Sequence, residues 1–162
     1  MTEQAQIVLD LLDEKGISYE VTEHTPVFTI DEMLELNLPH PEWIAKNLFV
    51  RDDKKKNYYL LVVQEEKRVE LKVLRKQLGL RPLTFASEED LNRILNLTRG
   101  AVTPFGILND QERIVQVLID KEFKGQIMGI HPNVNTATVW ISSQDLMALL
   151  KEHGNSAEYV QI

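Results

Sequence analysis

The feature that most limits the fold of this chain is a run of six apolar residues at 58–63. A strand with one solvated face alternates apolar and polar side chains, and this run leaves no polar face. We therefore expect a strand that is buried on both faces. A second apolar run at 43–50 precedes it, and the charged stretch between the two runs indicates a hairpin with a solvated tip.

Helical and strand patterns alternate along the rest of the chain. Thr2 can cap the first helix, and Thr29 and Glu32 form a capping box before the second. The mixture of hairpins and helical crossovers predicts an α/β fold in a single domain, 1–162, with a mixed, mostly antiparallel sheet and helices packed around it. The expected helices cover 3–15, 29–37, 69–78, 87–95 and 143–154, and the expected strands cover 17–21, 43–50, 58–63, 83–86, 114–120, 127–130, 136–141 and 158–162.

Composition excludes several kinds of chemistry. The chain has 162 residues and no cysteine, so disulfides, thiolate catalysis and cysteine-based zinc sites are ruled out. Its first residues lack the pattern of a signal peptide, and no apolar run approaches the roughly 20 residues that span a bilayer. We therefore expect a cytoplasmic protein that does not bind membranes.

The charge of the chain is unevenly distributed. The net charge is −7, which argues against a nucleic-acid partner. Between Lys46 and Arg81, however, eleven Lys and Arg residues face five Asp and Glu residues, a local balance of +6. Such asymmetry fits a local face that contacts phosphates, but it also fits a solvated hairpin tip and an ordinary helix surface.

Lys46 is the most informative single residue. It interrupts an apolar run, and a buried lysine without a partner is costly. Its side chain therefore points either outward to solvent or into a site that uses its charge, and the pattern allows both. In a cleft it could bind a phosphate or a carbonyl oxygen, or stabilise developing negative charge.

Two loops concentrate polar or small residues. The loop at 129–136 places His131 between two strands, and the loop at 100–106 contains two glycines and a proline, so its backbone can approach a ligand closely. Ordinary turns have similar composition. The sequence lacks histidines spaced as metal ligands, a nucleophile elbow and a glycine-rich phosphate-binding motif.

Taken together, segments 44–52, 100–106 and 129–136 resemble the three signature segments of the YbaK/ProX family of aminoacyl-tRNA editing domains. These are free-standing relatives of the editing domain inserted in bacterial prolyl-tRNA synthetases. The resemblance runs along nearly the whole chain in the right order, and the ProX branch is the more similar one.

The resemblance implies roles for individual residues. Lys46 would be the key catalytic lysine, and His131 would line the pocket as a second catalytic candidate. Lys46 would place the aminoacyl ester. The substrate-binding residues would be Asn47 beside the lysine, a tight wall made by Gly100, Ala101, Val102, Thr103 and Pro104, loop supports Asn133, Asn135 and Thr136, and an opposite wall of Thr22, His24 and Phe28.

The implied activity is trans-editing, which is hydrolysis of the ester between a misattached amino acid and tRNA, with Ala-tRNA(Pro) as the leading substrate. An activated ester needs no covalent nucleophile, metal or cofactor if the site positions water and stabilises the oxyanion. The expected partners are mischarged tRNA and prolyl-tRNA synthetase. Two alternatives stay open: a non-catalytic module that binds aminoacyl-tRNA or a synthetase, and a deacylase of the Cys-tRNA(Pro) type. A small-molecule ester or amide hydrolase is a further option.

Overall fold

Strand β3 (Tyr58–Gln64) is the central strand of a five-stranded sheet with the order β4-β2-β3-β5-β8. The structure is a computed structural model that describes residues 1–27 and 29–162. Every side chain from Tyr58 to Val63 is at most 5% exposed. The predicted burial of this strand on both faces is therefore confirmed.

The five-stranded sheet is mixed. Strand β2 (Ala45–Asp52) pairs antiparallel with β3 and with β4 (Leu83–Phe85). Strand β5 (Val115–Asp120) runs parallel to β3 and to β8 (Ala157–Val160), which lies at the sheet edge. The predicted hairpin and the predicted C-terminal edge strand are both confirmed.

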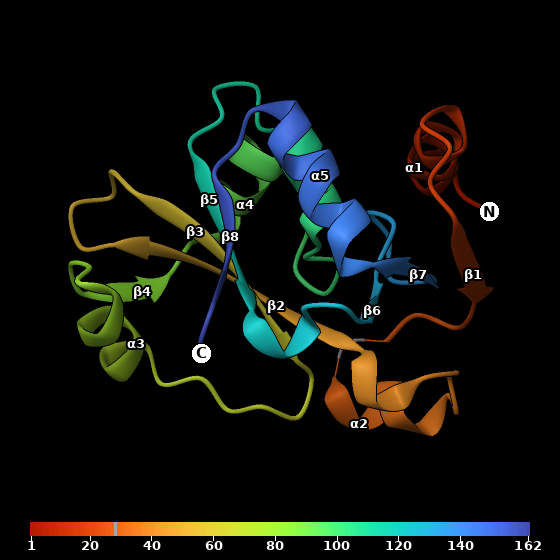
Figure 1. Ribbon diagram of the computed structural model, residues 1–162, viewed down its shortest axis with the longest axis horizontal. Helices are drawn as coiled ribbons and strands as arrows, with labels where there is room; N and C mark the ends of the chain where they lie inside the picture. Colours follow the sequence, from red (N-terminus) through yellow and green to blue (C-terminus); the bar gives the residue numbers. More distant parts are fainter. Residues whose placement is uncertain (28) are drawn as a thin grey trace.

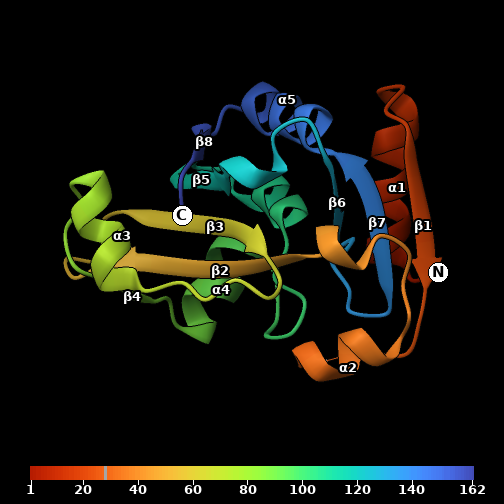
Figure 2. The same ribbon diagram turned by 60° about the horizontal axis from the view of Figure 1, so that its bottom comes forward.

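A second sheet stands beside the first (Figures 1 and 2). Strand β7 (Ala137–Ser142) lies between β1 (Tyr19–Glu23) and β6 (Ile127–Ile130), and both pairings are antiparallel. An isolated bridge between Ile44 and Gly129 joins this sheet to the start of β2. The expected α/β class is confirmed, and the structure adds that the strands divide between two sheets.

Gly129 is required at this junction. A Cβ atom there would lie 2.4 Å from the indole ring of Trp140, so only glycine lets the indole lie against the strand. Trp140 is 3% exposed and packs with Ile44, Met33 and other residues in a small apolar cluster. Gly129 and Trp140 are paired in β6 and β7, so this close approach lies within the smaller sheet, next to the Ile44 bridge to the larger one.

The helices cover both sheets. Side chains of α1 pack with those of β7 and α5 in the main core, whereas Leu74 of α3 packs on the opposite face of the larger sheet. In Figure 2, α2 lies apart from the other helices, below the start of β2. The helices are α1 (Glu3–Glu14), α2 (Ile30–Glu35), α3 (Leu71–Leu78), α4 (Glu88–Leu95) and α5 (Ser143–His153), and the 3-10 helices are η1 (Pro41–Trp43), η2 (Pro104–Asn109) and η3 (Lys121–Phe123).

Most of the predicted helix starts are confirmed. The Thr2 hydroxyl accepts a hydrogen bond from the amide of Ala5, and the Thr29 hydroxyl accepts one from the amide of Glu32. The final helix differs by one residue, because Ser142 is its cap and the buried hydroxyl of Ser143 donates to the carbonyl of Phe123 at 2.6 Å. No helix in the described part of the chain is long and apolar enough to cross a membrane.

Candidate functional site

A cavity of about 210 Å³ opens where the two sheets meet. Five residues that the sequence singled out line it together, although they come from three separate segments of the chain. The remaining lining residues are mostly apolar. The predicted lining residues are Lys46, Asn47, Gly100, Val102 and His131, and the others are Val27, Thr29, Met33, Ile44, Ala45 and Glu65.

The side chain of Lys46 points into this cavity, which decides between the two orientations that the sequence left open. Lys46 is the second residue of β2 and pairs with Val63 of the central strand. Its Nζ atom donates a hydrogen bond to the carbonyl oxygen of Lys67. Burial lowers the pKa of Lys46, and the nearby Glu65 carboxyl opposes that shift. An ammonium group has three donors, so two remain for a ligand.

The carbonyl that holds Lys46 belongs to an anchored loop. The Lys67 side chain reaches the end of β5, where its Nζ atom lies 2.6 Å from Oδ2 of Asp120 and 3.6 Å from Oε1 of Glu122. Partial burial lowers the pKa of Lys67, but the hydrogen bond and charge of Asp120 outweigh it, so the pKa is raised overall. The ion pair thereby fixes the position of the acceptor of Lys46.

Glu65 is a residue of the cavity that sequence reasoning missed. It follows β3 directly and is only 5% exposed, and its Oε2 atom has no hydrogen-bond partner among the described residues. Burial and the charge of Glu66 raise the pKa of Glu65 to about 7, while Lys46 acts in the opposite direction. The only signal in the sequence was an acidic residue next to a fully apolar strand.

His131 joins the two special loops. Its carbonyl accepts a hydrogen bond from the Thr103 hydroxyl at 2.5 Å, and its Nδ1 atom lies 3.0 Å from the carbonyl of Ala137. Because a carbonyl oxygen can only accept, Nδ1 carries the proton and Nε2 keeps a lone pair. Burial lowers the pKa of His131, the hydrogen bond to Ala137 opposes that shift and the charge of His24 adds to it, so the balance favours the neutral ring.

The loop at 100–106 approaches Asn47 closely. The Asn47 Nδ2 atom donates to the carbonyl of Val102 at 3.3 Å, and the Asn47 Oδ1 atom is buried without a partner among the described residues. Gly100 has a φ of 91°, a conformation that favours glycine. Thr103 and Pro104 are buried behind this wall.

Other predicted site residues lie around the cavity without lining it. Ala101, Asn133 and Asn135 line a neighbouring hollow of about 430 Å³, and the Asn135 amide also donates to the carbonyl of Val27. The ring of His24 lies 6.2 Å from that of His131, and its Nε2 atom is 2.9 Å from the Thr138 hydroxyl. Thr22 is in β1, and the carbonyl of Thr136 accepts a hydrogen bond from the amide of His24. Phe28 lies outside the described residues. The roles expected for these residues stay predictions.

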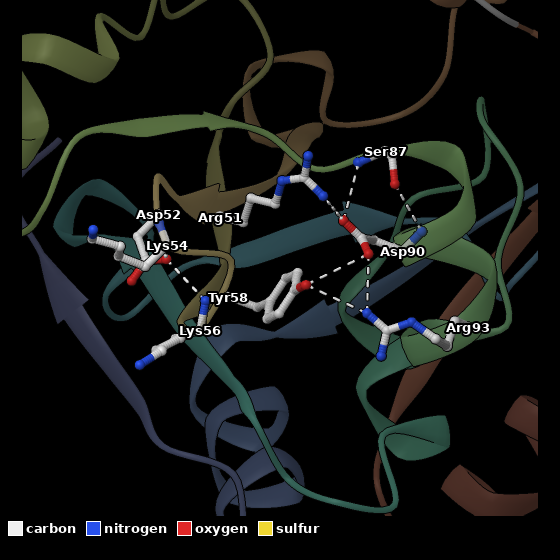
Figure 3. Close-up of polar contacts among 8 residues, drawn as sticks. All are labelled: Arg51, Asp52, Lys54, Lys56, Tyr58, Ser87, Asp90 and Arg93. Atoms are coloured by element: carbon white, nitrogen blue, oxygen red, sulfur yellow. Dashed lines mark hydrogen bonds and ion pairs between the residues drawn. The ribbon is translucent and has the colours of Figure 1, made fainter.

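Three of the eleven basic residues between Lys46 and Arg81 form ion pairs within the protein. Figure 3 shows Asp90 held by Arg51 and Arg93 and contacted by the hydroxyl of Tyr58. Arg81 pairs with Asp53, as Lys67 does with Asp120. In segment 46–81, most of the basic residues that make no ion pair with a described residue lie at the hairpin tip and on α3, at the far end of β2 from Lys46 (Figure 1). These residues are Lys54, Lys55, Lys56, Lys72, Arg75 and Lys76, and Arg68 lies just before α3.

In the part of the chain that the structure describes, no three His, Cys, Asp or Glu side chains are arranged to hold a metal ion. The cavity itself brings one lysine, one carboxyl and one imidazole together with apolar walls. The expectation of a site without metal or cofactor stays a prediction.

Comparisons with known proteins agree with this geometry. A family model for the aminoacyl-tRNA editing domain matches residues 24–149. The prolyl-tRNA editing protein ProX of Acetoanaerobium sticklandii is 42% identical over 158 residues, which are 97% of this chain and 96% of that protein. The prolyl-tRNA synthetase associated domain-containing protein 1 of Mus musculus is 35% identical over 148 residues, with 86% and 85% of the two chains covered. The crystal structure of a proposed trans-editing enzyme for prolyl-tRNA synthetase aligns with a TM-score of 0.76 over 99% of this chain and 97% of that one, and its identity of 21% shows a shared fold only.

Proposed function

Because the chain belongs to the aminoacyl-tRNA editing domain family, we propose that it is a trans-editing hydrolase that cleaves the ester of mischarged tRNA(Pro), with Ala-tRNA(Pro) as its substrate. Membership confirms the family that the three segments predicted, and with it the enzyme class of aminoacyl-tRNA deacylases. The name of the relative from Acetoanaerobium sticklandii supports tRNA(Pro) as the carrier. The observation that carries the proposal is the single cavity that joins Lys46, Gly100 and His131.

Lys46 would stabilise the charge that develops during hydrolysis. Water attacks the ester carbonyl carbon, the bond to the ribose oxygen breaks, and that oxygen takes up a proton. The two free donors of the Lys46 ammonium group can hold the carbonyl oxygen or the terminal phosphate, since one donor is already fixed on Lys67. A preorganised donor in a partly buried cavity stabilises an oxyanion more strongly than water does.

The walls of the cavity would select the amino acid. Val27, Met33, Ile44 and Val102 are apolar, and the space of about 210 Å³ must hold the ester as well as the side chain. A small apolar side chain fits such walls without leaving an unpaired polar group. This favours alanine over cysteine, and it requires that the larger ring of proline be excluded.

The loops would fix the shape of this space. Thr103 ties the loop at 100–106 to His131, and Asn135 ties the loop at 129–136 to Val27, so the two walls move as one unit. His131 would therefore orient and shape the cavity, and Lys46 would contribute most to the rate. The free lysines of the hairpin tip and α3 would contact tRNA phosphates, and prolyl-tRNA synthetase is the proposed source of mischarged tRNA.

Deacylation of purified Ala-, Cys- and Pro-tRNA(Pro) tests the proposal. We expect hydrolysis of Ala-tRNA(Pro), slower hydrolysis of Cys-tRNA(Pro) and survival of Pro-tRNA(Pro). Lys46→Ala should lose the activity, and Lys151→Ala, which removes an exposed lysine on α5, should retain it. Binding of mischarged tRNA with no hydrolysis would overturn the proposal in favour of a non-catalytic module.

A further inference from the structure

The carboxyl group of Glu65 is the least explained group in the cavity. It is 5% exposed, and its Oε2 atom has no hydrogen-bond partner among the described residues. Lys46, whose charge acts on Glu65, donates its hydrogen bond to the carbonyl of Lys67. A buried carboxyl without a partner is costly when it is ionised. The raised pKa of Glu65, about 7, reflects that cost. Such a group is either a defect or one half of a pair that a ligand completes.

Two further polar groups of the cavity, on Asn47 and His131, offer unused hydrogen-bond acceptors. The Asn47 amide is oriented by its contact with Val102, because a carbonyl cannot donate, and this leaves Oδ1 as an unused buried acceptor. The same reasoning fixes the proton of His131 on Nδ1 and leaves Nε2 as an acceptor. Glu65, Asn47 and His131 thus offer acceptors, and Lys46 offers the only charged donor among the described lining residues.

From this inventory we infer that Glu65 binds the α-ammonium group of the aminoacyl ester, with Asn47 as a second acceptor. The inference rests on the proposed function. It assigns to Glu65 the recognition of the α-ammonium group, which all aminoacyl esters share. An ammonium group carries three donors and a positive charge, which matches a carboxylate and neighbouring neutral acceptors. The carbonyl of the same ester is an acceptor, which matches the free donors of Lys46.

Charge balance supports the assignment. The α-amino group has a pKa of about 7.7–8.0, so it enters the cavity mostly as a cation at pH 7. Glu65 is the one acidic residue among the described lining residues, and without it the cation would meet only the like charge of Lys46. Binding therefore converts an unpaired buried carboxylate into a hydrogen-bonded ion pair. A substrate with a blocked amine would leave Glu65 unpaired.

Two ligands that differ only at the amine test this inference. The first is 3′-(L-alanylamino)-3′-deoxyadenosine, in which an amide replaces the ester so that it cannot be deacylated, and the second is the same molecule with its amine acetylated. The wild-type protein should bind the free amine at least about tenfold more tightly, as expected for a hydrogen bond between charged groups. Glu65→Gln should bind both ligands equally, within about twofold. Glu65→Asp should keep part of the preference.

Glu66→Gln is the matched control, because it removes the same charge from the next residue, whose side chain is exposed. It should keep the preference for the free amine. No amine preference in the wild-type protein, or equal weakening of both ligands by Glu65→Gln, would overturn the inference. Hydrolysis of Ala-tRNA(Pro) is measured separately, so a protein that prefers the free amine through Glu65 but hydrolyses no mischarged tRNA would refute the proposed function and leave this binding site standing.

Discussion

Replacing Glu65 with glutamine should stabilise the protein at neutral and alkaline pH. Glu65 is buried and its Oε2 atom has no partner among the described residues. Burial, together with Glu66, raises the pKa of Glu65 from its ordinary value of 4.5 to about 7 in the folded state. Glutamine has nearly the same shape and no charge, so the variant removes the ionisation of this one group and little else.

The sign and size of the effect follow from proton linkage. Between pH 4.5 and about 7 the folded state binds more protons than the unfolded state, so Glu65 makes stability fall as the pH rises, and its full cost is present above pH 7. Each pKa unit corresponds to about 1.4 kcal/mol. Relative to the wild type, Glu65→Gln should therefore gain about 1 kcal/mol of unfolding free energy at pH 5 and about 3 kcal/mol at pH 8.

Urea unfolding followed by circular dichroism at pH 5, 6, 7 and 8 measures this difference directly. Every other titrating group is common to both proteins, so the change of the difference with pH isolates Glu65. Glu112→Gln, which removes a carboxylate from an exposed loop, controls for the loss of one surface charge. If the difference in unfolding free energy between Glu65→Gln and the wild type stays constant from pH 5 to pH 8, the carboxyl does not titrate near pH 7 in the folded state and the reasoning fails.

Three further outcomes are expected. Lys46→Ala should lower kcat/KM for the proposed substrate Ala-tRNA(Pro) by about 100-fold or more, because it removes the proposed oxyanion donor. His131→Ala should lower it by about tenfold, because it removes a neutral hydrogen bond that shapes a loop. Comparable losses would contradict this ranking. Asp120→Asn should lower the free energy of unfolding in urea by about 2 kcal/mol, because it removes the charged partner of Lys67, and an unchanged midpoint would contradict it. Triple alanine replacement at the hairpin tip should weaken tRNA binding and reduce the slope of log K against log salt concentration by about two to three. Binding of the alanyl-adenosine amide should stay unchanged. Equal weakening of both ligands would show that the variant is misfolded. The replaced residues are Lys54, Lys55 and Lys56.

The parts of the fold that depend on local pattern could be predicted from the sequence. The apolar run in β3 leaves no polar face, and a strand with that pattern needs neighbours on both sides and cover on both faces. Helix caps are equally local, since a hydroxyl and an amide three residues apart make the contact. A shift of one residue, as at Ser142 and Ser143, is smaller than local pattern can resolve.

The division into two sheets could not be predicted, because it depends on pairing between distant segments. Strand β1 pairs with β7, more than a hundred residues later, and nothing in either strand specifies the other. The contact of Gly129 with Trp140 is local by comparison, but the sequence does not specify it, since glycine at this position suits a turn as well as a close approach. Burial of single side chains depends on the folded chain in the same way, since the apolar Ile7 of α1 is 62% exposed.

The candidate site also has a part that the sequence predicts and a part that only the folded chain reveals. The three segments around Lys46, Gly100 and His131 were recognised as a set, and the structure places these three residues on one cavity. In the sequence, Glu65 is only one of the five acidic residues between Lys46 and Arg81, and an acidic residue after a strand is common at protein surfaces. Its importance depends on burial and on the lack of a partner, and both are properties of the folded chain.

The same properties connect the stability of the protein to its proposed ligand. Glu65 opposes folding at neutral pH, and a ligand that carries an ammonium group offsets that cost only when it is bound. A ligand that binds only the folded state raises stability by RT ln(1 + [L]/Kd), so at equal concentration the tighter ligand raises it more. The alanyl-adenosine amide should therefore raise the melting temperature of the wild-type protein more than its acetylated form does, and Glu65→Gln should start from a higher melting temperature and respond equally to both. A buried carboxylate that costs stability and gains it back from one class of ligand is the behaviour expected of a binding residue, whereas an error of packing would cost stability with every ligand.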